Sequence, residues 1–173
     1  ADYGVNPAGF IIHSAIHSHL DNAHWVMHTH TREGVAVSVK EHGLTNTNFY
    51  SAMLGDHVAY HDFEGLTVRT DECERLVKSI GDKPLIILRN HGLLTHGRSA
   101  EECFRRLWVL QQACETQVLS ESMAGPDRQV TPEATENSTR DGRLFNSNDE
   151  MGGGLMFEAL QRIIEVRDPT YRH

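Results

Sequence analysis

Two histidines stand at alternate positions in the stretch VMHTHT, residues 26–31. Side chains two residues apart on a strand point to the same side, so His28 and His30 would present two imidazoles together. Neutral imidazoles are common ligands of zinc and similar divalent ions. A His-x-His pair alone is weak evidence, because histidines that only form hydrogen bonds are more common. A metal site here therefore needs a third ligand from elsewhere in the chain.

Two residues further along the chain could supply that third ligand. His91 lies between Asn90 and Gly92, in a predicted tight turn after an apolar run, and such a turn can point a side chain into a cleft beside a neighbouring strand. His96 is the alternative. Three imidazoles held on rigid elements leave a coordination position for water or substrate, as catalytic zinc sites do.

A second histidine pair, His13 and His17, has the i, i+4 spacing of neighbouring side chains on one helix face. Such a pair can chelate a metal, but no acidic residue stands between the two, as it does in the zinc-protease signature. We interpret this pair as structural, although eight of the twelve histidines of the chain lie in its first third.

The segments that must position these side chains alternate between helical and extended patterns. Residues 10–20, FIIHSAIHSHL, repeat apolar residues at the spacing of one helix face, and residues 24–30, HWVMHTH, have the pattern of a short buried strand. Residues 32–43 are compatible with a helix stopped by Gly43, or with a strand because of their valine content. We further predict a strand within 55–65, a helix over 71–83 ended by Gly81, strands at 85–88 and 93–95, and a long helix over 99–122 capped by Ser99.

The 173 residues fit one domain with its own core. We expect that domain to span residues 1–122, with an N-terminal part missing because the chain opens without methionine. Residues 123–154 are rich in Gly, Pro, Ser, Thr and Asn and predict a polar linker or mobile segment. Residues 155–173 predict an amphipathic helix and tail that dock on the domain or on a neighbouring subunit.

Composition narrows the classes of partner. A formal net charge of -8 and a pI near 5.8 argue against nucleic acid or an anionic membrane surface as the main partner, since both need a basic surface. No apolar run approaches the roughly 20 residues of a membrane span. The three cysteines are odd in number and match no ligand motif, which favours a reducing, cytoplasmic setting.

Several motifs in the same order resemble one known family. NPAGFIIHSAIH, VMHTHTREGVAVS, AYHDFEG, LIILRNHGLLTHGRSAEECF and FEALQRIIEVRDPTYR resemble the class II aldolase and adducin head domain family, and the first and third look closest to its adducin-like branch. The resemblance implies an α/β fold with three layers, α/β/α, around a central, largely antiparallel sheet. It also implies a divalent ion, usually zinc, held by His28, His30 and His91. Manganese, iron or cobalt would suit three imidazoles as well.

The resemblance also implies two kinds of function. The first is a carbon–carbon lyase that cleaves an aldol or decarboxylates a small oxygenated substrate through a metal-stabilised enolate. The second is a non-catalytic, adducin-like oligomeric assembly module that keeps the fold, with or without the metal. A metal-dependent oxygenase on the same scaffold is a third reading, because three histidines leave open positions for iron. Family members are commonly tetramers, which implies a homo-oligomer here.

Two departures from the aldolase pattern concern catalysis. Aldolases of the family carry a glutamate that serves as acid/base four residues before the position of His13, and this chain has Gly9 there. Glu33 or His61 could take over that role. The glycine- and asparagine-containing phosphate loop of the family has no counterpart before Ala1. A tyrosine that family members contribute from the adjoining subunit would fall on Tyr50 only with a one-residue shift, and a packing role is the alternative.

Overall fold

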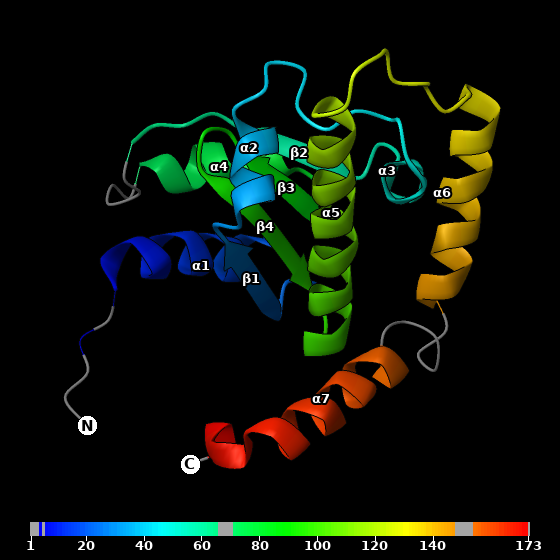
Figure 1. The fold of residues 1–173 in the computed structure, drawn as a ribbon. Coiled ribbons are helices and arrows are strands. Elements are labelled where there is room, and N and C mark those ends of the chain that lie inside the picture. The colour runs from blue at the N-terminus through cyan, green and yellow to red at the C-terminus, as the bar shows by residue number, and fades with distance from the viewer. Residues whose placement is uncertain (1–3, 5, 66–70, 148–153, 173) are drawn as a thin grey trace.

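A four-stranded sheet forms the centre of the computed structural model (Figure 1). The two pairings β1–β4 and β4–β3 are antiparallel, and β3–β2 is parallel, so the predicted α/β fold with a largely antiparallel sheet is confirmed. The structure describes residues 4, 6–65, 71–147 and 154–172. In spatial order the strands are β1 (Trp25–Thr29), β4 (Gly92–Gly97), β3 (Leu85–Leu88) and β2 (Val58–His61).

Helices cover both faces of this sheet, which gives the three layers expected. Helices α1 (Pro7–His19) and α4 (Glu72–Ile80) pack together on one face. Helices α2 (Arg32–Ser38) and α5 (Ala100–Glu121) pack together on the other. Ser99 caps α5 and Gly81 ends α4, as the sequence predicts.

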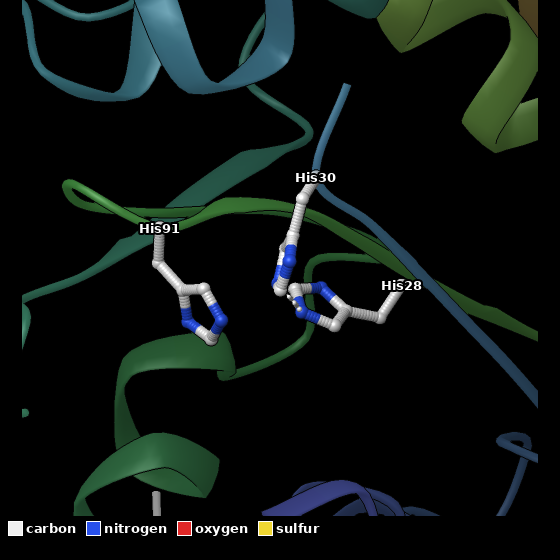
Figure 2. A group of neighbouring side chains, drawn as sticks. All are labelled: His28, His30 and His91. Carbon is white, nitrogen blue, oxygen red and sulfur yellow. Dashed lines mark hydrogen bonds between the residues drawn. The ribbon is translucent and has the colours of Figure 1, made fainter. Parts of the chain in front are cut away.

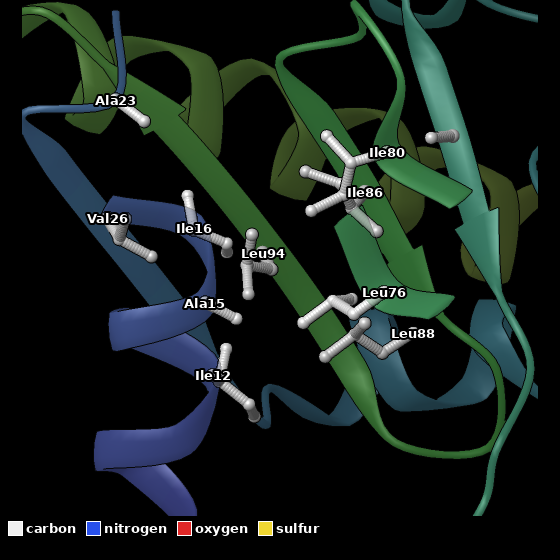
Figure 3. Close-up of a cluster of buried hydrophobic side chains, with 11 residues drawn as sticks. Ile12, Ala15, Ile16, Ala23, Val26, Leu76, Ile80, Ile86, Leu88 and Leu94 are labelled. Atoms are coloured by element: carbon white, nitrogen blue, oxygen red, sulfur yellow. The ribbon is translucent and has the colours of Figure 1, made fainter. Parts of the chain in front are cut away.

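The two faces of the sheet bury separate hydrophobic clusters. Under α1 and α4, the side chains of Ile16, Ile86 and Leu94 are fully buried (Figure 3). On the opposite face, Ile87 and Leu93 pack with residues of α5. Successive residues of one strand point to opposite faces, so β3 contributes to both clusters and its sequence is apolar throughout. The two hydrophobic clusters, one on each face, thus fix the positions of the strands in the sheet.

The valine-rich segment after β1 is a helix rather than a strand. Thr31 accepts a hydrogen bond from the Gly34 amide at 3.3 Å, which caps α2, and Val37 is buried against the sheet. The predicted stop at Gly43 is wrong, because α2 ends at Ser38. Gly43 instead has a φ of 66° in the loop that follows, a conformation that glycine adopts without strain.

A short helix that the sequence patterns did not predict, α3 (Phe49–Leu54), packs against α5. Its N-terminus has a capping box: the Asn48 side chain accepts from the Ser51 amide at 3.0 Å, and the Ser51 hydroxyl accepts from the Asn48 amide at 3.1 Å. Two otherwise unpaired backbone donors are thereby satisfied. The helix is too short to show a hydrophobic period, so this cap was its only strong sequence signal.

Replacing Asn48 by alanine should lower the free energy of unfolding by about 1 kcal/mol, because the amide of Ser51 loses its acceptor. Urea unfolding followed by circular dichroism measures the change. Asn48→Ser retains a capping oxygen and should stay within a few tenths of a kcal/mol of the wild type. Equal losses in both variants would show that the cap does not stabilise α3.

The segment predicted as a polar linker contains a regular helix, α6 (Pro132–Ser147), which packs on α3. Thr139 donates to the Ala52 carbonyl of α3 at 3.0 Å, and Asn46, in the loop before α3, donates to the Thr135 hydroxyl at 2.5 Å. Gly142 is buried beside Met53. Composition predicts an irregular segment because these contacts use threonine, asparagine and glycine, which give no apolar period.

The last elements are α7 (Leu155–Arg167) and a 3-10 helix at Pro169–Arg172. Helix α7 contacts α5 through Phe157 and Phe104, whose ring centroids lie 5.6 Å apart. The other side chains of α7 are exposed or half-buried, and Leu155 and Ile163 are among the exposed apolar ones. In the part of the chain that the structure describes, no helix combines the length and the apolar character needed to cross a membrane.

Candidate metal centre

Three histidine side chains converge at one end of the sheet (Figure 2). His28 lies on β1, His30 directly follows that strand, and His91 lies in the turn between β3 and β4. Their candidate ligand nitrogens all lie within 4.8 Å of one another, and their ring centroids are 4.6 to 4.8 Å apart. The structure therefore brings together the three residues that the sequence pattern singled out.

The strand register explains this convergence. Thr29 pairs with Leu93, so the turn that precedes β4 lies beside the end of β1. Within that turn Asn90 has a φ of 57°, a left-handed conformation that asparagine tolerates better than most residues. Gly92 lies so close to β1 that an added Cβ would collide with the Thr29 carbonyl oxygen. Asn90 and Gly92 therefore allow His91 to approach His28 and His30.

Hydrogen bonds fix the orientation of His28. Its Nδ1–H donates to the Leu93 carbonyl at 2.8 Å, so the Nε2 atom of the neutral ring is the free acceptor. This Nε2 lies 2.7 Å from Nε2 of His30, a spacing at which His30 donates a proton that His28 accepts. A ring nitrogen held by a backbone carbonyl while the other faces the site is the usual arrangement of a metal-ligating histidine. The donor set and its support thus fit a divalent ion.

The surroundings of His28 and His91 keep both rings uncharged. Burial lowers the pKa of His28 to about 4, and the nearby imidazoles of His91 and His30 add to the effect, although the hydrogen bond to Leu93 opposes it. Burial and the neighbouring His30 also lower the pKa of His91. A metal ion binds the neutral imidazole, so these shifts favour ligation down to mildly acidic pH.

We expect the metal-free protein to lose stability as the pH falls from about 6.5 toward 4. Unfolding returns the pKa of His28 to near 6.5, so between these values the unfolded chain binds the extra proton. Because the ring is partly exposed, the loss should be on the order of 1 kcal/mol. Urea unfolding in chelator at several pH values tests this. His28→Gln, which does not titrate, should show a shallower pH dependence than the wild type, and identical profiles would contradict the assignment.

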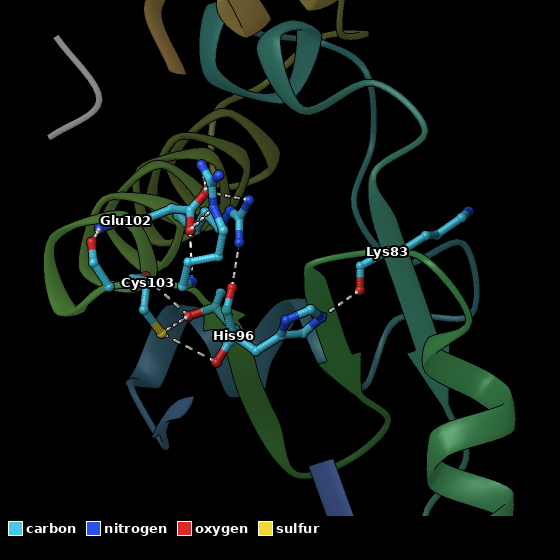
Figure 4. A network of polar contacts seen from close by, with 8 residues as sticks. Lys83, His96, Glu102 and Cys103 are labelled. Atoms are coloured by element: carbon cyan, nitrogen blue, oxygen red, sulfur yellow. Dashed lines mark hydrogen bonds and ion pairs between the residues drawn. The ribbon is translucent and has the colours of Figure 1, made fainter. Parts of the chain in front are cut away.

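The rival ligand His96 belongs to a different polar network (Figure 4). It lies near the opposite end of β4 from His91, where its Nε2 is 3.3 Å from the Lys83 carbonyl oxygen. Arg106 donates to the His96 carbonyl at 2.6 Å and also binds Glu102. His96 therefore joins the sheet to α5 and does not take part in the histidine cluster.

The two histidines on α1, His13 and His17, have different surroundings. His17 lies 2.6 Å from the Ala23 carbonyl oxygen through its Nδ1 atom and ties α1 to the loop before β1, which agrees with a structural role. His13 lies close enough to His28 to contribute to the low pKa of that ring, and its own pKa is lowered by burial and by His17. His13 is thus a neighbour of the cluster that the i, i+4 pattern did not reveal.

The residues considered for acid/base chemistry lie in different places. A side chain at Gly9, one helical turn before His13, would meet no atom within 4 Å of its Cβ. Glu33 is turned toward α5, where it accepts from Gln111 at 3.3 Å. Tyr50 packs in the cluster on the far face of the sheet. The fourth candidate, His61, is buried on β2 beside Glu72, an acidic residue that the sequence patterns did not single out.

Comparisons with known proteins place this geometry in context. A family profile described as "Class II Aldolase and Adducin N-terminal domain" matches residues 1–118. The crystal structure of an aldolase II superfamily protein from Pseudomonas syringae superposes with a TM-score of 0.91 at 37% sequence identity, over 98% of this chain and 67% of that one. The structure of L-fuculose 1-phosphate aldolase from Glaciozyma antarctica superposes with a TM-score of 0.77 at 25% identity, over 96% of this chain and 61% of that one.

Adducins also occur among the relatives. Alpha-adducin of Mus musculus is 43% identical over 129 residues, which cover 73% of this chain and 17% of the adducin. Two putative aldolase class 2 proteins, from Caulobacter vibrioides and Pseudomonas aeruginosa, match 98% of the chain at 38% and 37% identity, and the chain spans 65% and 66% of their lengths. The chain is therefore similar both to an aldolase and to adducin.

Proposed function

Because the chain belongs to the class II aldolase and adducin N-terminal domain family, we propose that it is a metal-dependent carbon–carbon lyase. The observation that carries this proposal is the convergence of His28, His30 and His91, with ligand nitrogens within 4.8 Å of one another. The reaction class is aldol cleavage or decarboxylation of a small oxygenated substrate. The L-fuculose 1-phosphate aldolase with the same fold supports this class.

The three imidazoles would hold the ion, and zinc is the ion we favour, with manganese, iron or cobalt as alternatives. When bound, a divalent ion would polarise a substrate carbonyl and stabilise negative charge on its oxygen. His30 is exposed while His28 and His91 are half-buried, so a small molecule can approach from the side of His30. The Leu93 carbonyl keeps the His28 ring in the tautomer that leaves Nε2 available.

Metal analysis and turnover assays test the proposal. The purified protein should contain close to one divalent ion per chain, and it should cleave or decarboxylate members of a panel of ketose phosphates and 2-oxo or 3-oxo acids. A chelator should abolish the turnover, and added metal should restore it. Full metal occupancy with no turnover on any member of the panel would count against the lyase.

A second candidate function is a non-catalytic, adducin-like assembly module that forms homo-oligomers. Two observations favour it: the 43% identity to alpha-adducin and the glycine at position 9, which cannot transfer a proton. Gly9→Glu separates the two functions, because the open space at this position admits the side chain. In a lyase the added carboxylate should change turnover at least tenfold. In an assembly module Gly9→Glu should create no turnover. His28→Ala should then change only the stability or the oligomeric state of the protein.

A further inference from the structure

A buried polar pair lies beside the histidine cluster, on the same face of the sheet. His61, at the end of β2, and Glu72, in the first turn of α4, are 6% and 7% exposed. Their Nε2 and Oε1 atoms are 3.7 Å apart, which is too far for a direct hydrogen bond. Buried polar atoms are nearly always hydrogen-bonded, so the buried Nε2 atom of His61 at this spacing needs an explanation beyond packing.

The protons around His61 can be assigned from its contacts. Ser79 donates its hydroxyl proton to the Arg75 carbonyl at 2.9 Å, so its oxygen is free to accept from His61 Nδ1, 3.0 Å away. The Nε2 atom of a neutral His61 ring is then an acceptor. Among the described residues this buried atom has no hydrogen-bond partner. It faces Glu72 and requires a donor between them.

A small cavity supplies the space for such a donor. It has a volume of about 10 Å³, and its lining includes His61, Glu72 and the candidate ligand His91. The rest of the lining comes from Ile12, Leu76, Leu88, Arg89 and residues 62–65. One ordered water molecule needs about this much room and two to four polar partners. A water here could donate to His61 and to Glu72 and accept a ring N–H of His91, which lines the same cavity.

The fold explains why these groups meet. His61 pairs with Leu88 at the ends of the parallel strands β2 and β3, and the chain reaches His91 three residues after Leu88. Leu76 of α4 packs in the same cluster as Leu88, which brings the first turn of α4, with Glu72, to the same end of the sheet. The positive N-terminus of α4 also favours a carboxylate in that turn.

We propose that Glu72 and His61 position the metal ligand His91 through one bridging water. Glu72 is a positioning residue, because it acts on the metal through the imidazole of His91. The inference rests on the proposed metal site and adds to it the group that orients its third ligand. Metal-binding histidines in proteins usually donate their second N–H to such a partner, and loss of the partner typically weakens metal binding 10–100-fold.

Cobalt binding to the full chain tests the inference. Glu72→Gln keeps the size of the side chain and should weaken Co²⁺ affinity 10–100-fold in competition with a chelator, with a shifted visible spectrum of the bound cobalt. Glu74→Gln is the matched control, because Glu74 is an exposed acid in the same helical turn. It should leave affinity and spectrum unchanged. Ser79→Ala, which releases His61, should act in the same direction as Glu72→Gln and provides a second variant if that one does not fold.

The outcomes separate this inference from the proposed function. Wild-type protein that fails to bind Co²⁺ or Zn²⁺ would overturn the metal site, and with it both proposals. Wild-type protein that binds Co²⁺ while folded Glu72→Gln and Ser79→Ala bind it with the same affinity and spectrum would overturn the inference alone. Unchanged lyase turnover with weakened cobalt binding would still support the positioning role.

Discussion

Replacing His28 by alanine is expected to weaken divalent-metal binding by about 100–1000-fold. Zinc bound by four protein ligands gains about 10–16 kcal/mol, so each ligand contributes about 3–4 kcal/mol, and 1.4 kcal/mol corresponds to a tenfold change in affinity. His28 is the best test among the three proposed ligands, because its ring is held by Leu93 and its pKa is lowered to about 4. Chelator competition with Zn²⁺ or Co²⁺ measures the change, and any lyase turnover should be lost with the metal.

His24→Ala is the matched control for this experiment. His24 is exposed and directly precedes β1, so its loss removes an imidazole near the same strand without altering the cluster. Metal affinity should then remain within about twofold of the wild type. If both variants bind metal equally well, His28 is not a ligand, and the site must be sought elsewhere.

Replacing Gly92 by alanine is expected to lower the free energy of unfolding by about 1–3 kcal/mol and to disrupt metal binding. An added Cβ would collide with the Thr29 carbonyl oxygen and lie 3.2 Å from Cδ2 of His30. Neither strand can yield easily, because β4 pairs with both β1 and β3. The turn that carries His91 must therefore move away from His30. Urea unfolding and metal titration report the two effects separately.

Gly9→Ala provides the contrast for Gly92→Ala. A Cβ at position 9 meets nothing within 4 Å, and the residue lies in helix α1. Alanine is the better helix former by up to about 1 kcal/mol, so this variant should be as stable as the wild type or slightly more stable, with unchanged metal binding. A comparable loss of stability in both variants would argue against the close approach of β4 to β1.

Local patterns in the sequence predicted most of the sheet and the pair His28 and His30. Alternation placed His28 and His30 on one side of a strand, and Asn90 and Gly92 marked the turn that presents His91. The patterns could not decide between His91 and His96, because that choice depends on which end of β4 lies beside the end of β1. The family resemblance favoured His91, and the strand register agrees with it.

The elements that the sequence missed are held by tertiary contacts with weak local signals. Among the described contacts of helix α6 are a threonine hydrogen bond to α3, an asparagine hydrogen bond from the loop before α3, and a buried glycine, and none of these gives an apolar period in the sequence. Glu72 was missed for a related reason. In sequence it is one of several acids at the start of an amphipathic helix, and only the packing of α4 on the sheet reveals that it is buried beside His61.

The support of the three histidines by the sheet has an evolutionary consequence. Strand register and two hydrophobic clusters set the spacing of the imidazoles, and the His28–His30 hydrogen bond links two of them within the protein itself. Packing and strand pairing within the protein thus position the three side chains. A function that uses only the scaffold would keep these contacts even if a proposed ligand were replaced. The family profile that matches this chain carries both names, aldolase and adducin.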